Sequence, residues 1–226
     1  TEAPESEILS ENNNAINNNY HSINVQQDVG IKYKFDTLGS NLDTRLGYNF
    51  YHNENTQDYE YHFTLPDDFF LNGNGENIQK RHFITGQSDL TKKLPHKISL
   101  EAGIKTSFQH YESKSDYFVD ISGTIINDSL RTNSFLYEEN INAGYLQLTK
   151  TFGEDLVLKA GLRAEQTYMD GRQSIPTDTS FLINRVDLFP YVYLSRRILH
   201  IMGIDLRAFL IYRKTIDRPG YDMLNP

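Results

Sequence analysis

The sequence has no cysteine and no tryptophan, and none of its apolar runs reaches the roughly 20 residues that a membrane-crossing helix needs. Without cysteine the chain forms no disulfide bonds, which suits an exported protein and a cytosolic protein equally. Lys and Arg number 22 against 30 Asp and Glu, and no basic cluster offers a surface for nucleic acid. These absences exclude a helical membrane protein and argue against a nucleic-acid-binding one. They leave a transmembrane β-barrel open, because a barrel strand shows lipid an apolar side chain only at every second residue.

The N-terminal segment differs in composition from the rest of the chain. Residues 1–19 contain acids and then six asparagines, with almost nothing apolar to bury. We therefore expect a mobile segment or loop over 1–19, and we assign residues 20–226 to a β-barrel domain of four hairpins. The chain begins at Thr1 without a Met or an apolar signal segment, so we expect a mature product or an excised fragment.

From about residue 20 onward, apolar and polar residues alternate with the period of a β-strand. The apolar positions are odd-numbered over 23–35 and even-numbered over 42–50, 98–108, 156–164 and 202–212. Weaker alternation over 81–94, 140–152 and 186–197 supplies the strands that complete the hairpins. We predict an all-β, antiparallel up-and-down transmembrane barrel with about eight strands in this chain, apolar toward lipid and polar toward a lumen.

The connections between the predicted strands alternate in length. Tight connections are expected at 36–41, 94–96, 152–155 and 197–199, and long loops at 64–78, 113–138 and 173–184. Alternate connections of an up-and-down barrel lie on the same rim, so one rim would carry short turns and the other long loops. This is the polarity of outer-membrane barrels, whose long loops are extracellular.

Aromatic residues recur at similar distances from the tight turns. Each lies about nine to twelve residues along its strand, which is the span of a membrane-crossing strand that ends in an interfacial aromatic girdle. The predicted girdle consists of Tyr48, Phe50, Phe108, Tyr168 and Tyr212. Residues 53–63 continue as a polar and aromatic strand beyond it, so the hairpins are expected to project above the membrane.

Three phrases carry a resemblance to a known family. They are Phe152-Gly153 followed by the strand from Leu158 to Glu165, then Asp187-Leu188-Phe189-Pro190, and then the stretch 213–226, which contains Asp217-Arg218-Pro219 and ends in Leu224-Asn225-Pro226. In these phrases the chain resembles the outer-membrane β-barrel domain of TonB-dependent receptors. The matches cover about the C-terminal third of the chain.

The resemblance implies a larger protein than this chain. Such receptors have a barrel of about 22 strands, an N-terminal plug domain and an inner-membrane energy-coupling protein as partner, and some work with a surface lipoprotein. The Leu-Asn-Pro phrase lies in mid-barrel in this family, so the chain would be a partial barrel. We recognise no plug and no box for the coupling partner in these residues.

Other candidate sites have simpler explanations. The seven histidines lack ligand spacing, so we expect no metal site and no cofactor. The acidic pairs Asp67-Asp68 and Glu138-Glu139 fall in or beside predicted long loops, where charge is normally solvated. Gly73-Asn74-Gly75 indicates a turn, since no phosphate-loop Lys follows it. We expect no catalytic residues and no enzyme activity.

Two groups of side chains remain as functional candidates. The lumen-side charges either pair across strands or line a path for a solute, and the need of any barrel for a polar interior favours pairing. These charges are Lys32, Lys34, Arg45, Glu101, Lys105, Lys159, Arg163, Glu165, Asp205, Arg207 and Arg213. Loop aromatics could contact a ligand at the extracellular mouth or pack the loops together. They are Tyr59, Tyr61, Phe69, Phe70 and Tyr117.

The leading hypothesis is a receptor barrel in the outer membrane of a Gram-negative bacterium, embedded in lipid, which imports a bulky nutrient such as an iron chelate, glycan or peptide. A second hypothesis is an outer-membrane scaffold or assembly barrel without coupled transport. A third is a secreted soluble β-sandwich adhesin or enzyme module. The sandwich would require Leu46, Leu100, Leu162 and Leu206 to share a dry core between two sheets.

Overall fold

The computed structural model describes residues 11–65, 67–121, 123–153 and 155–216, which form a single antiparallel sheet. Its strands are β1 (Glu11–Lys34), β2 (Asn41–Leu65), β3 (Phe69–Leu94), β4 (Ile98–Ile121), β5 (Thr124–Asn127), β6 (Asn133–Phe152), β7 (Leu156–Ile175), β8 (Thr179–Ile201) and β9 (Ile204–Arg213). The long strands pair in chain order, and the short β5 pairs with β4 alone. The predicted all-β, up-and-down architecture is therefore confirmed. Among the described residues there is no helix long and apolar enough to cross a membrane.

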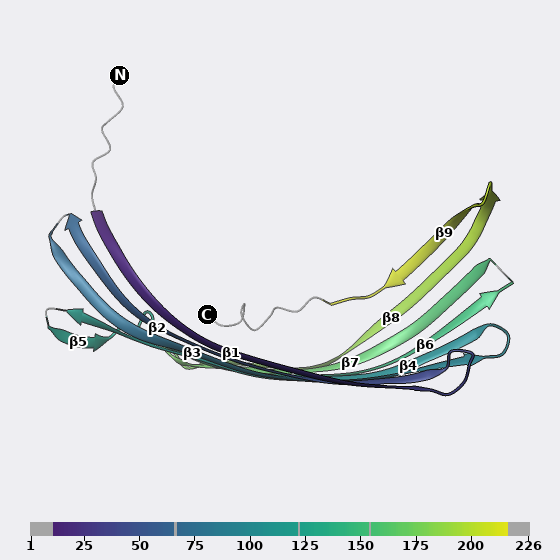
Figure 1. Cartoon of the computed structure of the whole chain (residues 1–226), viewed down its shortest axis with the longest axis horizontal. Coiled ribbons are helices and arrows are strands. Elements are labelled where there is room, and N and C mark those ends of the chain that lie inside the picture. The colour runs from purple at the N-terminus through teal and green to yellow at the C-terminus, as the bar shows by residue number, and fades with distance from the viewer. Residues whose placement is uncertain (1–10, 66, 122, 154, 217–226) are drawn as a thin grey trace, which may run out of the picture.

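The sheet is one layer thick and bowed along its strands (Figure 1). The ends of the β1–β2 and β2–β3 pairs rise at one side, and the β8–β9 hairpin rises at the other. The sheet is not closed, because β1 and β9 form its two edges. Leu46, Leu162 and Leu206 keep 59%, 49% and 56% of their surface exposed, so they share no dry core. The β-sandwich alternative is wrong for this part of the chain.

The strand register places the predicted apolar positions on one face, which we call the outer face. One row across seven strands shows this, since each of its residues is opposite the next. The row is Tyr33, Leu42, Leu90, Ala102, Leu146, Leu162 and Pro190. Neighbouring residues in a strand point to opposite faces. The polar residues between these positions therefore line the other face, which we call the inner face.

Two of the tight turns show how the sequence reverses the chain. In the first, the Asp36 carboxylate accepts hydrogen bonds from the backbone N–H groups of Leu38 and Ser40, both at 2.9 Å, and Gly39 supplies a φ of +98°. Hydrogen bonds from Ser40 and from Leu38 lower the pKa of Asp36 from its ordinary value, so this turn is built around an ionised carboxylate. In the second, His96 and Lys97 both have positive φ, as type I′ hairpin turns require.

Several element boundaries differ from the predictions. Residues 11–19 belong to β1 and pair with β2, so the expected loop is wrong there, while residues 1–10 lie outside the described residues. Strand β8 continues through a register shift at 197–199 to Ile201, and the turn falls at Met202 and Gly203 instead of at 197–199. The predicted long loops at 64–78, 113–138 and 173–184 are mostly strand, because hydrogen-bonded pairing runs on to Leu65, Ile121 and Ile175.

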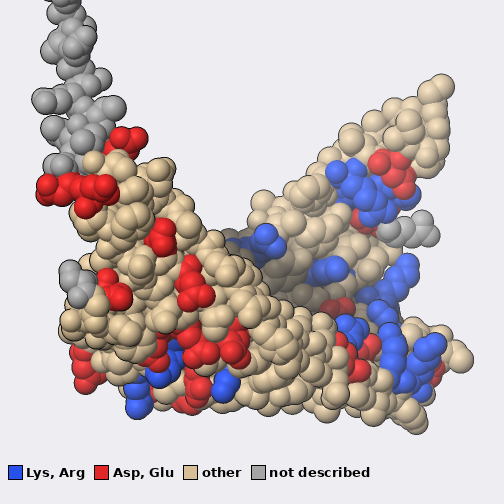
Figure 2. All heavy atoms as spheres, turned by 60° about the vertical axis from the view of Figure 1, so that its left-hand side comes forward, with Lys and Arg blue, Asp and Glu red and all other residues tan. Residues whose placement is uncertain are grey.

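Several inner-face charges form ion pairs within the sheet, and of three such pairs one joins neighbouring strands while two join residues two apart on a single strand. Asp43 lies 2.9 Å from the Arg45 guanidinium and 3.7 Å from the Lys32 ammonium. Arg163 contacts the buried Glu165 at 2.7 Å. Figure 2 shows Lys and Arg side chains in the hollow between the two raised ends of the sheet. A solute path along these charges stays a prediction.

Candidate ligand-binding face at the barrel mouth

The alternation of polar and apolar side chains inverts part-way along the strands. On β4 the outer face is mostly apolar from Ile98 to Phe108 and mostly charged from His110 onward, while the inner face gains Tyr111, Tyr117 and Val119. The same inversion occurs on β2 and β7. In the register it follows the row that contains Tyr48, Phe108 and Tyr168, three of the predicted girdle residues. We call the strand parts beyond this row the extension.

The other two predicted girdle residues lie in different rows. Phe50 is one outer-face position beyond Tyr48, and its ring lies 4.9 Å from the ring of His82. Tyr212 is opposite Val192 in the part of β8 nearer the tight turns. The girdle as a whole stays a prediction, with Tyr48, Phe108 and Tyr168 as a continuous row.

Aromatic rings form a ladder on the inner face where β2 meets β3. The ring centroids of Tyr59 and Tyr61 are 5.6 Å apart, those of Tyr61 and Phe63 are 6.4 Å apart, and Phe63 stacks on Phe69 at 4.5 Å. Residues two apart on a strand share a face, which explains the spacing of the first three rings. Phe69 is 45% exposed and Tyr61 is half-buried, so the far part of the ladder is open to solvent.

The Tyr59 end of the ladder is covered by an arginine from the loop between β5 and β6. The Arg131 guanidinium lies over the Tyr59 ring at 4.5 Å and over the Tyr117 ring at 4.1 Å, and it also donates a hydrogen bond to the Gln57 side-chain oxygen. Such cation–π contacts stabilise by about 0.5–2 kcal/mol each. Together they hold this loop against the inner face of the extension.

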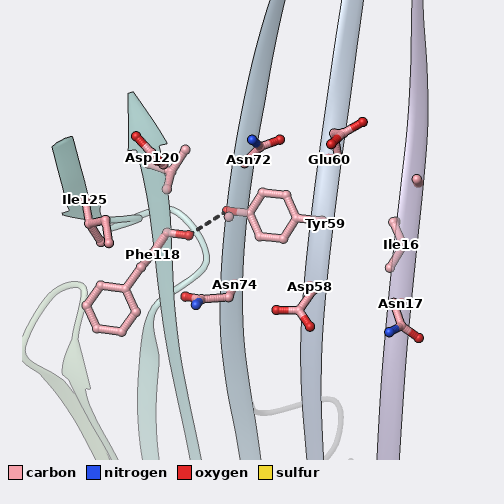
Figure 3. Close-up of a pocket in the computed structure, with 13 residues that line it drawn as sticks. Ile16, Asn17, Asp58, Tyr59, Glu60, Asn72, Asn74, Phe118, Asp120 and Ile125 are labelled. Atoms are coloured by element: carbon pink, nitrogen blue, oxygen red, sulfur yellow. Dashed lines mark hydrogen bonds between the residues drawn. The ribbon is translucent and has the colours of Figure 1, made fainter. Parts of the chain in front are cut away.

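Glycines on β3 provide the space for the two covered tyrosines. A Cβ at Gly73 would lie 2.2 Å from the Tyr59 ring, and a Cβ at Gly75 would lie 2.1 Å from the Tyr117 ring. Because Gly73 has no side chain, the Tyr59 hydroxyl reaches across β3 and donates to the Phe118 carbonyl oxygen at 3.1 Å (Figure 3). The sequence Gly73-Asn74-Gly75 is therefore part of a strand whose two glycines leave room for two tyrosine rings, and its interpretation as a turn is wrong.

A second apolar cluster occupies the inner face of the extension from β4 to β8. Tyr111, Phe135, Tyr137 and Met169 are buried and packed together, with Phe181 against them. Sequence reasoning did not find this cluster because it followed the outer-face positions and treated these stretches as loops. The signal was the inversion itself, since apolar residues move to the other parity beyond Phe108.

The outer face of the extension is mainly acidic. Figure 2 shows Asp and Glu gathered on the end that bears the N-terminal strands. A groove of about 550 Å³ crosses β1 to β5 there, and its lining includes Asp58, Glu60 and Asp120 (Figure 3). Alternation along the strands places these three carboxylates on the outer face.

Two of the histidines make side-chain contacts within the sheet. Within the described ranges, no group of three or more His, Cys, Asp or Glu side chains could hold a metal ion. His82 shares a hydrogen bond with the Tyr48 hydroxyl at 3.0 Å, and His62 stacks on Phe70 while it pairs with Asp68 at 2.8 Å. These contacts account for both histidines as structural side chains.

His110 is expected to make the stability of the extension depend on pH. Burial lowers the pKa of His110, but hydrogen bonds to Glu112 at 3.0 Å and Glu138 at 3.1 Å raise it, and the net shift is upward. The stabilising charge pairing is therefore complete below pH ~6.5 and is lost as the pH rises through the raised value. We expect the unfolding midpoint to fall more for the wild type than for His110→Gln between about pH 5.5 and about pH 8.5.

Guanidinium unfolding of the full-length protein in lipid vesicles at several pH values measures this difference. His21→Gln, at an exposed position on β1, is the control and should follow the wild type. Equal pH profiles for the wild type and His110→Gln would contradict the assignment.

The five aromatic residues proposed as ligand contacts have different surroundings. Tyr59 and Tyr117 are 5% and 9% exposed and lie beneath Arg131, so a ligand on the inner face could not contact them directly. Tyr61 and Phe69 belong to the accessible part of the ladder. Phe70 is 56% exposed, and the alternation places it on the outer face with His62. Of the five, Tyr61 and Phe69 are the ones on the inner face that a ligand could reach.

A comparison with protein families decides what this sheet is. The model of the outer membrane protein beta-barrel family matches residues 33–226. The chain belongs to this family. Its location is the outer membrane of a Gram-negative cell, and the apolar outer face is the surface that meets lipid. The recognition of an outer-membrane barrel from the phrases in the C-terminal third of the chain is thereby confirmed.

Comparisons with individual proteins add two findings. Among solved structures, the crystal structure of the ferric citrate transporter FecA in the unliganded form matches with a TM-score of 0.40 and 12% identity. The match covers 79% of this chain and 34% of that transporter, so the chain spans about a third of its length. A search of curated proteins gives no match.

Proposed function

We propose that this family member belongs to the barrel of a TonB-dependent type receptor that takes up a bulky nutrient through the outer membrane. The observation that carries the proposal is the inner face of the extension, where exposed aromatic rings are mounted on paired strands beyond the membrane. Binding residues are commonly placed on projecting segments that a rigid scaffold holds in position. A barrel whose only task was to span the membrane would need no such inner-face ladder.

Transport would require parts that lie outside this chain. In the proposed mechanism the nutrient binds to the inner face at the mouth, and a plug domain then moves under the action of an inner-membrane energy-coupling protein. This chain supplies the wall and the binding face, and its chemistry is recognition rather than catalysis. A surface lipoprotein is a proposed partner at the mouth.

Energy-dependent uptake tests the proposal. Cells that express the full-length protein, and cells from which its gene is deleted, would be given radiolabelled ferric citrate, a labelled neutral oligosaccharide or a labelled tetrapeptide. We expect one probe to accumulate only in cells with the protein, and we expect a protonophore to abolish this accumulation.

The alternative function, a scaffold or assembly barrel, gives a different result. A scaffold would show no probe uptake that depends on both the protein and the proton gradient, and its deletion would instead change the composition of the outer membrane. That result would overturn the transport proposal and leave the membrane location of the barrel unchanged.

A further inference from the structure

The two faces of the extension differ sharply in charge. The charged side chains of β2, β3, β4, β6 and β7 beyond the girdle row point mostly to the outer face. These outer-face residues are Glu54, Asp58, Glu60, Glu76, Lys80, Glu112, Lys114, Asp116, Asp120, Glu138, Asp170 and Arg172. The strands that carry them place two charged residues, Arg81 and Glu139, on the inner face of the extension.

The few inner-face charges are engaged by neighbouring side chains. Arg81 donates to the Asn49 side-chain oxygen at 3.0 Å and lies 6.0 Å from the centre of the Tyr51 ring. Glu139 accepts a hydrogen bond from the Tyr137 hydroxyl at 2.9 Å. Arg131, which reaches this face from its loop, lies over two tyrosine rings and donates a hydrogen bond to Gln57. We call the inner face of the extension the wall. An anionic ligand would therefore meet no cluster of basic groups on this wall.

Uncharged side chains, five of eight of them carboxamides, line the inner face of β1 over residues 12–26. From residue 12 to residue 26 the inner-face positions are Asn12, Asn14, Ile16, Asn18, Tyr20, Ser22, Asn24 and Gln26. Strand β2 continues the pattern, since Asn49 donates to Asn24 at 2.9 Å and Gln57 donates to Asn18 at 2.7 Å. A carboxamide both donates and accepts hydrogen bonds, which suits a ligand whose groups do the same.

The amides and the ring ladder lie side by side. In the register, Asn12 is opposite Phe63 and Asn14 is opposite Tyr61. All of β1 is exposed, and neither Asn12 nor Asn14 is among the hydrogen-bonded amides described above. The wall thus offers ring faces beside uncharged donors and acceptors, repeated along the strand.

We infer that this wall binds a neutral oligosaccharide, an inference that rests on the proposed function and names its ligand class. Sugar rings present apolar C–H faces that stack on aromatic rings, and their hydroxyl groups exchange hydrogen bonds with carboxamides. Successive rings at 5.6 and 6.4 Å match a ligand built from repeated rings. A ferric chelate with anionic groups calls for Arg or Lys, and a free peptide brings two charged termini.

Titration calorimetry on the detergent-solubilised full-length protein tests the inference. The probes are neutral oligosaccharides of glucose, mannose, galactose and xylose, with an oligogalacturonate, ferric citrate and tetra-alanine as charged competitors. We expect one neutral oligosaccharide to bind, and Tyr61→Ala to weaken its binding by about tenfold. Asn14→Ala should weaken it about threefold to tenfold through a lost hydrogen bond. Tyr61→Phe, which keeps the ring, should retain most of the affinity.

The matched control is Glu60→Gln, which changes the adjacent residue on the outer face and should leave affinity unchanged. Tighter binding of a charged probe, binding unaffected by Tyr61→Ala, or a panel in which no neutral sugar binds would each overturn the inference. Protonophore-sensitive uptake of ferric citrate without sugar binding would retain the receptor and remove the saccharide site. Sugar binding at Tyr61 without energised uptake would keep this site and remove the transport function.

Discussion

Replacing Leu146 by arginine should destabilise the barrel by about 2–4 kcal/mol, because the side chain would face hydrocarbon near the middle of the bilayer. Leu146 is 55% exposed on the outer face, and it is opposite Ala102 on β4 and Leu162 on β7. It lies six residues from Phe152, at the tight-turn end of β6. An arginine at this depth can neither reach water nor find a carboxylate on the apolar face.

The adjacent residue provides the control for this substitution. Gln147 points to the inner face, where its amide donates to the Glu101 carboxylate at 2.9 Å. Gln147→Arg places the same charge one residue away, beside a carboxylate and toward the lumen, so its effect should be small. Guanidinium unfolding of the full-length protein in lipid vesicles measures both variants. Equal losses of stability for the two would show that the outer face does not meet lipid.

The membrane-spanning half of the fold could be predicted because its pattern is strictly local. Alternation over 42–50 and 98–108 states which side chains face lipid, and the register of β2, β3 and β4 agrees with it. Bilayer thickness then sets the distance from the tight turn to Phe108. Neither inference needs knowledge of distant contacts.

The extension was harder to predict than the membrane-spanning half, because its sequence contains residues typical of strands together with residues typical of loops. Asparagine runs such as Asn17 to Asn19 and the glycines at 73 and 75 favour loops when each segment is taken alone. In the sheet, the asparagines pair with β2, and the two glycines make room for Tyr59 and Tyr117. Long-range pairing decides these segments, so their strand character becomes clear only when the neighbouring strand is in place.

The aromatic residues of the candidate site could be named from the sequence, and their role as ligand contacts stays a prediction. Aromatic content drew attention to residues 59–70, but no local pattern indicated that Arg131 would cover Tyr59 and Tyr117. That contact joins residues far apart in the chain, through a loop whose position depends on β4 and β5. The neutrality of the inner wall likewise emerges only after register assigns each charge to a face.

Replacing Gly75 by alanine should displace Tyr117 and release the loop that carries Arg131. The added Cβ would lie 2.1 Å from a Tyr117 ring carbon and within 2.5 Å of two others, so the whole ring must move. Overpacking of this kind costs about 1–3 kcal/mol, and the displaced ring would lose its contact with Arg131 at 4.1 Å. The backbone N–H of Tyr117 also donates to the Thr132 hydroxyl, which ties the loop to the same point.

Limited proteolysis of the full-length protein should therefore cut the segment 128–132 several times faster in Gly75→Ala than in the wild type, with a lower unfolding midpoint. Gly144→Ala is the matched control, since a Cβ there meets nothing closer than the Gly103 carbonyl oxygen at 4.0 Å. Unchanged cleavage in Gly75→Ala would mean that the loop is held by contacts other than the two rings. Faster cleavage in that variant alone would establish that a glycine on β3 fixes a loop above the mouth, because it leaves room for the ring on which Arg131 rests.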